Sequence, residues 1–229
     1  MFKTETHVHT REISACSHKR AVDMIRLYKE AGYSTVFISD HFQSNSLDVL
    51  GDIPWSEKMT IFLSGYYKAK HEGEILGVHV LPAAEICFAD SKNHYIAYGI
   101  TKEFLDAYPE FHKMSSAEFL PIARSAGIFI VHAHPYRDGS QSATPELVDA
   151  IEIYNSNPRH EDHSELSKAL AEKYDLPVTA GSDAHRDEDI ACSGIETEEE
   201  IKTTSDFIRL VKERKVRIIR GIANDILSE

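Results

Sequence analysis

Short apolar runs and amphipathic stretches alternate along the chain. Continuous apolar runs at 34–40, 78–85 and 128–134 have the length of buried strands. The stretches between such runs carry apolar residues at helical spacing, so the alternation predicts an α/β protein with mainly parallel strands and helices outside. Further strands are predicted around the first T-E-T-H-V-H-T segment and at 94–100, 150–154, 178–183 and 216–220, and helices at 20–32, 54–71, 115–127, 160–174 and after a cap at Ser205.

Seven or eight strand candidates in 229 residues favour a barrel over an open sheet. No linker-like segment interrupts the pattern, so residues 1–229 are expected to form one domain. The longest polar interruption, at 42–54, is a candidate lid. Ser115 and Glu118 predict a capping box, and Pro121 predicts a shortened or kinked helix after it.

Composition and charge restrict the setting and the partners of the protein. With 42% hydrophobic and 27% charged residues the chain is typical of soluble globular proteins, and it has no apolar run of the ~20 residues that a membrane span needs. We expect no signal peptide, and three widely spaced cysteines favour a reducing, cytoplasmic setting. A net charge of −12 disfavours duplex nucleic acid, whereas a small anionic substrate stays plausible if bound cations make the pocket locally positive.

Histidines and carboxylates recur at the ends of the apolar runs. His7 and His9 are two residues apart on one strand and therefore share a face. At the end of the next run we interpret His41 as a ligand and Asp40 as the carboxylate that orients it, although Asp40 also fits a simple loop cap. Glu85 ends a buried run, where a carboxylate is costly unless it is paired or bound to metal.

Two further strand ends carry the same residue types. His134 precedes Pro135 at the end of a strand, and His132 shares its face by spacing, either as a supporting base or as a packed interior histidine. Asp183 and His185 follow Gly181, which allows close backbone approach. In an alternating β/α chain the carboxyl ends of the strands are where active sites form, and imidazole with carboxylate suits Zn, Mn or Fe. The sequence therefore predicts a metal-dependent hydrolase.

In order along the chain, these motifs resemble the polymerase and histidinol phosphatase (PHP) superfamily. The resemblance rests on H-V-H-T at His7, S-D-H at His41, Glu85, H-P at His134 and G-S-D-A-H at Asp183. It implies a distorted (β/α)7, TIM-like barrel with two or three divalent metal ions. By the resemblance, one metal is held by His7, His9, Glu85 and Asp183, a second by Glu85, His94 and His134, and a third by His41, His185 and a ligand from the loop after H-V-H-T.

That loop offers two candidates for the missing ligand, His18 and Cys16. We assign His18 and keep Cys16 as the alternative. The length of the chain is similar to that of the small stand-alone phosphoesterases of the superfamily, without the polymerase modules of the replicative enzymes.

The reaction expected from this site is hydrolysis of a small phosphorylated substrate by a metal-bridging hydroxide. Glu85, Asp183 and His185 are the expected catalytic residues, and Arg137, just after H-P, is a candidate phosphate clamp unless it is a solvated loop residue. His185 and His132 are both candidates for protonating the leaving group. Glu152, near a strand end with Asn155, is expected to orient ligands.

Two other functions compete with this prediction. A metal-dependent amidohydrolase also begins with H-x-H, but commonly carries a lysine on a central strand, and no lysine lies at a strand end here. A non-catalytic metal-binding regulatory domain is disfavoured by the near-complete ligand set. The sequence does not identify the substrate or distinguish a monoester from a diester. It also leaves open the identity and number of the ions and the oligomeric state.

Overall fold

The computed structural model of the protein describes residues 1–140 and 145–221. Its strands join into one continuous sheet, which runs in the order β10-β9-β1-β2-β4-β5-β6-β7-β8, with β3 paired to β4. The strands are β1 (Phe2–Val8), β2 (Tyr33–Ile38), β3 (His41–Phe42), β4 (His79–Cys87), β5 (His94–Tyr98), β6 (Phe129–Ala133), β7 (Ala150–Asn155), β8 (Val178–Gly181), β9 (Ser193–Thr197) and β10 (Arg217–Arg220).

The sheet curls until its two sides meet next to β1. Ala184, just after β8, forms a parallel bridge with Val8 of β1. The backbone N–H of Ala184 donates to the His7 carbonyl at 3.2 Å, and that of His9 donates to the Ala184 carbonyl at 3.1 Å. The ring β1-β2-β4-β5-β6-β7-β8 is thereby nearly closed, which confirms the predicted distorted seven-stranded barrel.

The directions of the strands differ from the prediction at two places. β5 runs antiparallel to both β4 and β6, and β9 runs antiparallel to β1 and β10. Only residues 88–93 separate β4 from β5, a connection short enough for an antiparallel pair but too short for a crossover helix. The sheet is therefore mixed, and β9 was not predicted.

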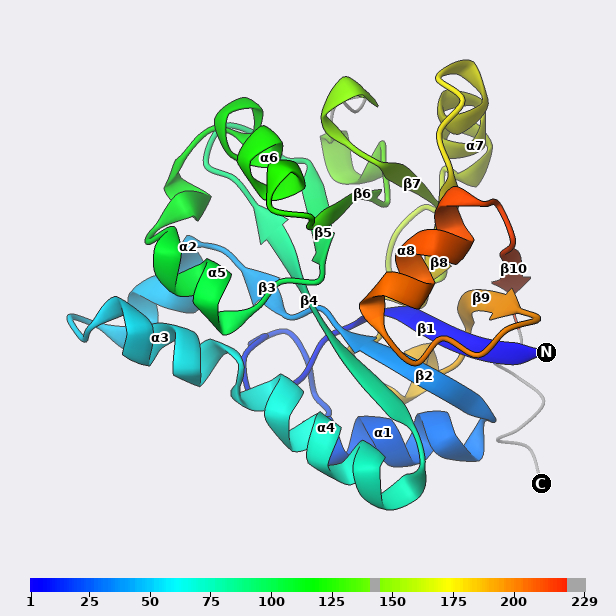
Figure 1. The fold of residues 1–229 in the computed structure, drawn as a ribbon, viewed down its shortest axis with the longest axis horizontal. Helices are drawn as coiled ribbons and strands as arrows, with labels where there is room; N and C mark the ends of the chain where they lie inside the picture. The colour runs from blue at the N-terminus through cyan, green and yellow to red at the C-terminus, as the bar shows by residue number, and fades with distance from the viewer. Residues whose placement is uncertain (141–144, 222–229) are drawn as a thin grey trace.

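Helices cover the outside of the barrel (Figure 1). The predicted helix at 54–71 is divided at Leu63 into α3 and α4, and the last helix is capped by Thr203, not Ser205, because the Thr203 hydroxyl accepts the Asp206 N–H. The predicted capping box at Ser115 is confirmed, and the helix continues through Pro121. The helices are α1 (Ala21–Glu30), α2 (Ser44–Leu47), α3 (Trp55–Phe62), α4 (Ser64–Leu76), α5 (Lys102–Ala107), α6 (Ser116–Ser125), α7 (Ser164–Lys173) and α8 (Thr204–Lys212), with 3-10 turns at Asp48–Leu50, Phe111–Lys113, Arg137–Gly139, Pro145–Leu147 and Asp187–Asp189.

One end of the barrel is filled by aromatic side chains. Phe207 of α8 packs against Phe37, Tyr98 and Phe129, with ring centroids 4.6–6.1 Å apart. Phe129 begins β6 and Tyr98 ends the antiparallel β5, so α8 covers the amino ends of the parallel strands. The carboxyl ends, which lie at the opposite end of the barrel, are left for polar residues. Within the described residues, no helix is long and apolar enough to cross a membrane.

Candidate metal centre

The histidines and carboxylates singled out in the sequence converge at the carboxyl end of the barrel. Glu85 of β4 lies at their centre and points its two oxygens toward different imidazoles. Its Oε1 lies 2.9 Å from both His94 Nδ1 and His134 Nε2, whereas its Oε2 lies 2.7 Å from His41 Nδ1 and 3.4 Å from His9 Nε2. A carboxylate arranged in this way can bridge two cations.

Asp183 is the second carboxylate of the cluster. Its Oδ1 lies 3.2 Å from His9 Nε2, 3.6 Å from His7 Nε2 and 3.4 Å from His185 Nδ1. The backbone at Asp183 has a φ of 51°, and that at His134 has a φ of 30°. Residues other than glycine rarely adopt this left-handed region, and such strain gathers at functional sites.

Several nitrogen atoms of the cluster have the geometry expected of cation ligands. Nδ1–H of His7 donates to Glu152 at 3.0 Å, which leaves the lone pair on Nε2. Within the described part of the chain, His7 Nε2 and His9 Nε2 are buried and make no hydrogen bond. Buried polar atoms are almost always satisfied, so these two nitrogens fit a cation well.

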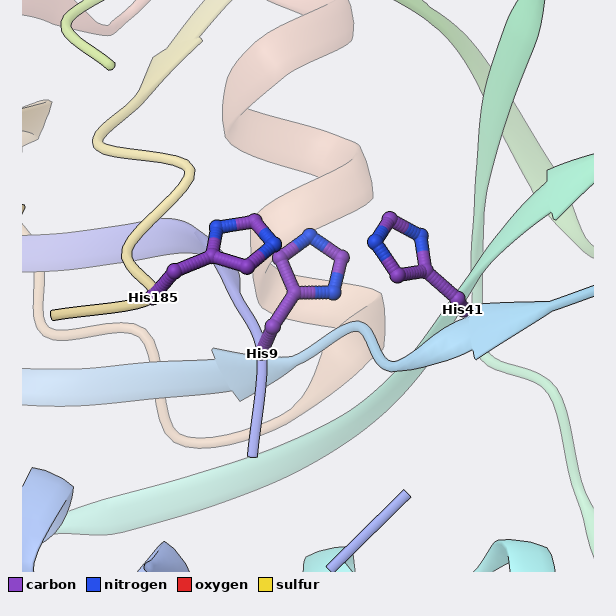
Figure 2. A group of neighbouring side chains, drawn as sticks. All are labelled: His9, His41 and His185. Carbon is purple, nitrogen blue, oxygen red and sulfur yellow. The ribbon is translucent and has the colours of Figure 1, made fainter. Parts of the chain in front are cut away.

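Four groups of three residues bring their ligand atoms within 4.8 Å of one another. Figure 2 shows one of them, in which the rings of His9, His41 and His185 meet from three separate segments with His9 between the other two. The four groups are His9–His41–His185, His7–His9–Glu85, His7–His134–Asp183 and Glu85–His94–His134. The residues present therefore fit more than one divalent cation, and their individual ligand roles stay predictions.

The cluster is also electrostatically balanced. Burial raises the pKa of Glu85, but the charges of His94, His41 and His7 outweigh it and hold that pKa well below its usual value. Burial, with the nearby charges of His41 and His185, holds the pKa of His9 well below its usual value. A neutral imidazole and an ionised carboxylate are the forms that bind cations.

The predicted supporting carboxylates hold the cluster in different ways. Glu152 of β7 accepts from His7 Nδ1 and, at 2.9 Å, from the backbone N–H of His134, so it positions two of the predicted ligands. Asp40 accepts from the N–H and hydroxyl of Thr10 and from the Ser14 hydroxyl at 2.6–2.8 Å. The Asp40 carboxylate therefore orders the loop after β1 and is hydrogen-bonded to that loop, not to the His41 ring.

His132 does not lie on the same face as His134, although its spacing in the sequence predicted that it would. β6 ends at Ala133 and the chain turns at His134, so the two histidines do not share a face. His132 pairs with Tyr95 across the sheet and stacks on its ring at 5.4 Å, on the side of the sheet opposite His94. Burial and the charges of His134 and His94 lower the pKa of His132 to about 3. His132 is a packed interior histidine, which was one of the two sequence interpretations.

Comparison with known proteins supports this picture. Residues 161–216 match the model of the PHP-associated family (PHP_C). A two-domain protein from Bacteroides vulgatus that contains a predicted PHP-like metal-dependent phosphoesterase superposes with a TM-score of 0.69. The two chains are 16% identical, and the alignment covers 96% of this chain and 65% of that one, so this chain spans about two thirds of its length. The family match and the shared fold support the predicted likeness to the PHP superfamily.

Two more solved structures share the fold of this chain. PsfC from Pseudomonas syringae has a TM-score of 0.66 at 17% identity, and the alignment covers 96% of this chain and 92% of PsfC. An amidohydrolase from Chromobacterium violaceum, with bound sulfate and no metal, has a TM-score of 0.54 at 12% identity, with 94% and 97% covered. No curated protein matches the sequence. At these identities the structural likenesses establish the fold.

The loop after β1 carries the two residues considered for the last PHP ligand. The side chain of His18 is exposed and belongs to none of the four groups found among the described residues. Cys16 instead lines the cavity beside the cluster, together with His185 and His41. Burial raises the pKa of this thiol, but those two imidazoles outweigh it and lower the pKa to about 6. Cys16 therefore lines the cavity beside the cluster, although it too belongs to none of the four groups, and the choice between the two ligands stays a prediction.

A cavity of about 380 Å³ opens above the cluster. Arg137 is part of its wall, and its Nη1 donates to Asp183 Oδ2 at 2.6 Å while its Nη2 donates to Asn155. Its Nε is buried and makes no hydrogen bond in the described residues. Arg137 is therefore not a solvated loop residue, which was the alternative interpretation of its position in the sequence. The lining also includes Cys16, His41, His94, Arg159, His160 and His185.

Glu5 is a buried carboxylate that the sequence interpretation missed. It lies on β1 and accepts from the backbone N–H groups of His7 and Ser182 at 3.0 Å, and from the Tyr28 hydroxyl of α1 at 2.9 Å. Burial raises the pKa of Glu5 to about 7 despite these donors. Glu5 thus ties β1 to the segment that carries Asp183. The carboxylate of Glu5, two residues before His7 on the same predicted strand, was the sequence signal that could have identified it.

Proposed function

We propose that the protein is a metal-dependent hydrolase that cleaves a phosphoester bond in a small substrate. The observation that carries the proposal is the position of Glu85, whose two oxygens face two different sets of imidazoles, with Asp183 in the same pocket. This arrangement suits two or three cations close together, which is the geometry that phosphoesterases use. The PHP match and the predicted phosphoesterase in the Bacteroides neighbour support the same chemistry.

The proposed role of each residue follows from its position in the centre. Bound cations would activate a water molecule and neutralise charge on the phosphoryl oxygens. His7, His9, Glu85 and Asp183 would hold them, together with His41, His94, His134 and His185. Glu152 keeps His7 in the tautomer that exposes Nε2, and Arg137 and Asn157 hold Asp183 in place.

His185 is the better placed candidate for protonating the leaving group. Its Nδ1–H donates to the Asp183 carbonyl at 2.8 Å, so Nε2 is the nitrogen that is available to the pocket, where it would serve either as this acid or as a cation ligand and not as both at once. His132 lies on the other side of the sheet and does not line the cavity, which argues against it for this role.

Arg137 is proposed to bind the phosphoryl group. Two of its five N–H bonds are engaged with Asp183 and Asn155, and Arg137 is part of the cavity wall. A guanidinium held in this way is fixed before substrate arrives, so it adds binding without a large ordering cost.

The test is turnover by protein that has been stripped of metal and reloaded with Mn or Zn. Phosphomonoesters and phosphodiesters are compared with amides and lactones, since the amidohydrolase neighbour shares the fold. We expect only phosphoesters to be hydrolysed, and Asp183→Asn to lower kcat by at least about 100-fold because an amide is a poorer cation ligand. Arg137→Ala should mainly raise KM.

Hydrolysis of amides or lactones alone would instead establish amidohydrolase chemistry. Among the described residues, the cavity lining holds no lysine, the residue that commonly bridges metals in such enzymes, and this favours the phosphoesterase proposal.

A further inference from the structure

The wall of the cavity is cationic outside the metal cluster. Arg137, Arg159 and Arg186 all line it, and within the described residues its only carboxylates are Glu85 and Asp183, which belong to the cluster itself. The chain as a whole has a net charge of −12, so three arginines around one cavity are opposite in sign to the protein's overall charge. A guanidinium matches the geometry of a carboxylate or a phosphate.

Arg159 is held in place by a buried carboxylate. Its Nη1 and Nη2 donate to the two oxygens of Asp189 at 2.8 and 2.7 Å. Asp189 is fully buried, and its Oδ2 also accepts the backbone N–H groups of His185 and Arg186 at 2.8 and 2.9 Å. The loop after β7 is thus fastened to the segment after β8. The pair with Asp189 uses two of the five N–H groups of Arg159, which itself forms part of the cavity wall.

Arg186 is held less firmly than Arg159. Its Nη1 lies 3.9 Å from Glu188, whose side chain is exposed, and an exposed ion pair at that distance contributes little. The Nε of Arg186 is buried and makes no hydrogen bond with any described residue. Glu188 also lies 3.8 Å from Arg159 but does not line the cavity, so an anionic ligand inside the cavity would compete with it for both arginines.

These two arginines are separate from the group that faces the cations. Arg137 donates directly to Asp183 of the cluster. Among the described residues, the side chains of Arg159 and Arg186 make their hydrogen bonds and ion pairs with Asp189 and Glu188, and not with any member of the cluster. The cations and Arg137 are sufficient for one phosphoryl group. Two further guanidinium groups on the same cavity therefore indicate a second anion.

We propose that the substrate carries a second anionic group, a carboxylate or another phosphate, and that Arg159 and Arg186 bind it. The proposal rests on the proposed phosphoester hydrolysis and names its class of substrate. Asp189 would be a positioning residue, because it holds the guanidinium of Arg159 at the cavity wall and is itself fully buried. A second anchor of this kind orients the phosphoester against the cations and so lowers the entropic part of the barrier.

The experiment is calorimetric titration of the zinc-loaded protein with phosphonates, which are not hydrolysed. Each alkylphosphonate is compared with the phosphonoalkanoate and the diphosphonate of the same chain, over chains of two to five carbons. The measured quantity is the ratio of affinities with and without the second anionic group. We expect that group to raise the affinity at least about tenfold at one or more chain lengths. Zinc content measured after each titration excludes chelation by the diphosphonates.

Variants assign the effect to particular arginines. Arg159→Met and Arg186→Met should each lower the ratio about fivefold or more. Arg137→Met should weaken both ligands of a pair and keep their ratio, and Arg209→Met on α8, at the opposite end of the barrel, is the matched control. Arg159→Met leaves Asp189 unpaired and can fail to fold, whereas Arg186→Met removes no partner of a buried carboxylate side chain and keeps the test valid. Circular dichroism verifies the fold of each variant.

The outcomes separate this proposal from the proposed function. A ratio near one at every chain length refutes the second anionic group, and a high ratio kept in both Arg159→Met and Arg186→Met removes it from these arginines. A preference for the carboxylate series alone or the diphosphonate series alone supports the proposal and identifies the group. Hydrolysis of phosphoesters with a ratio near one refutes only the second group. A protein that binds no phosphonate and hydrolyses no phosphoester refutes the proposed function and this proposal with it.

Discussion

Single side chains in this protein act through the partner that each one orients. Glu152 is fully buried, and its two oxygens accept from the His7 ring, the His134 backbone and the Asn155 amide at 2.9–3.0 Å. The last of these links it to Arg137, which also contacts Asn155. One carboxylate outside the cluster therefore fixes the tautomer of a predicted ligand and the backbone of another.

Replacement of Glu152 by glutamine should expose this dependence. The amide can present its NH₂ group to His7 Nδ1, which favours the tautomer with the proton on Nε2 and opposes cation binding. We expect Glu152→Gln to weaken zinc binding by about 10–100-fold with little change in the secondary structure. Competition with a chromogenic chelator measures the affinity, and Glu165→Gln on the exposed face of α7 is the control. Equal affinities of the two variants would remove Glu152 from the support of the centre.

At the scale of elements, the closure of the barrel places the two carboxylates in one site. β8 approaches β1 so closely that an added Cβ at Gly181 would lie 2.4 Å from His7 Cβ and 3.0 Å from Glu152 Oε1. Gly181 has no positive φ, so the requirement for glycine comes from space and not from backbone strain. The approach of these strands positions His7 against Asp183.

Gly181→Ala should therefore impair both folding and metal binding. The forced displacement of β8 from His7 is expected to cost about 1–3 kcal/mol of unfolding free energy and to weaken metal binding. Gly77→Ala is the matched control, because Gly77 has a φ of 68° and nothing within 4 Å of the added Cβ. It should cost about 1 kcal/mol through backbone strain and leave metal affinity unchanged. Denaturant unfolding and metal titration separate the two effects, and an unaffected metal affinity in Gly181→Ala would contradict the prediction.

At the scale of the whole molecule, the centre joins segments from both halves of the chain. Its residues run from His7 to His185 and stand on six separate segments of the barrel rim. A cation bound there links elements that are distant in sequence, and a ligand that binds only the folded state stabilises it by mass action.

Added zinc or manganese should raise the Tm, and a chelator should reverse the rise. The Tm should keep rising with metal concentration above the Kd, because the stabilisation grows with the logarithm of that concentration. In Glu85→Gln most of the rise should disappear, since one carboxylate faces both sets of imidazoles. Glu103→Gln, at an exposed position of α5, should respond like the wild type. Equal shifts in both variants, measured by differential scanning fluorimetry, would argue against a central role for Glu85.

The pH dependence of global stability should depend in part on His112, far from the centre. It is 2% exposed, lies parallel to the Trp55 ring and makes no hydrogen bond among the described residues. Burial, with the charge of Lys113, lowers its pKa in the folded state. As pH falls below about 6.5, the unfolded chain takes up a proton that the folded protein resists, so stability is lost on the acid side and not above it.

His112→Phe removes this proton uptake and keeps an aromatic ring beside Trp55. Its unfolding free energy should fall less than that of the wild type between pH 7.5 and pH 5, as measured by urea denaturation. His71→Gln, on the exposed face of α4, should follow the wild type. Parallel pH profiles for His112→Phe and the wild type would show that His112 does not contribute.

Local patterns in the sequence were enough to predict the ends of the barrel strands and the residues that stand there. A buried strand is a short apolar run wherever it occurs, and the carboxyl ends of successive parallel strands meet, so His7, His9, Glu85, His134 and Asp183 were expected to converge, as they do. The capping box at Ser115 is equally local.

Only the tertiary structure decided the rest. The antiparallel direction of β5 and β9 depends on which strands become neighbours, a matter of long-range pairing that no local pattern encodes. His132 faces away from the cluster because the chain turns at His134, and the loop after β1 is held beside the cluster by hydrogen bonds from Ser17 to the carbonyls of His9 and of the distant His185. The sequence by itself determined which side chains stand at the strand ends. The closure of the barrel decided which of their atoms face one another, because hydrogen bonds and contacts between residues 170 or more positions apart depend on the whole fold.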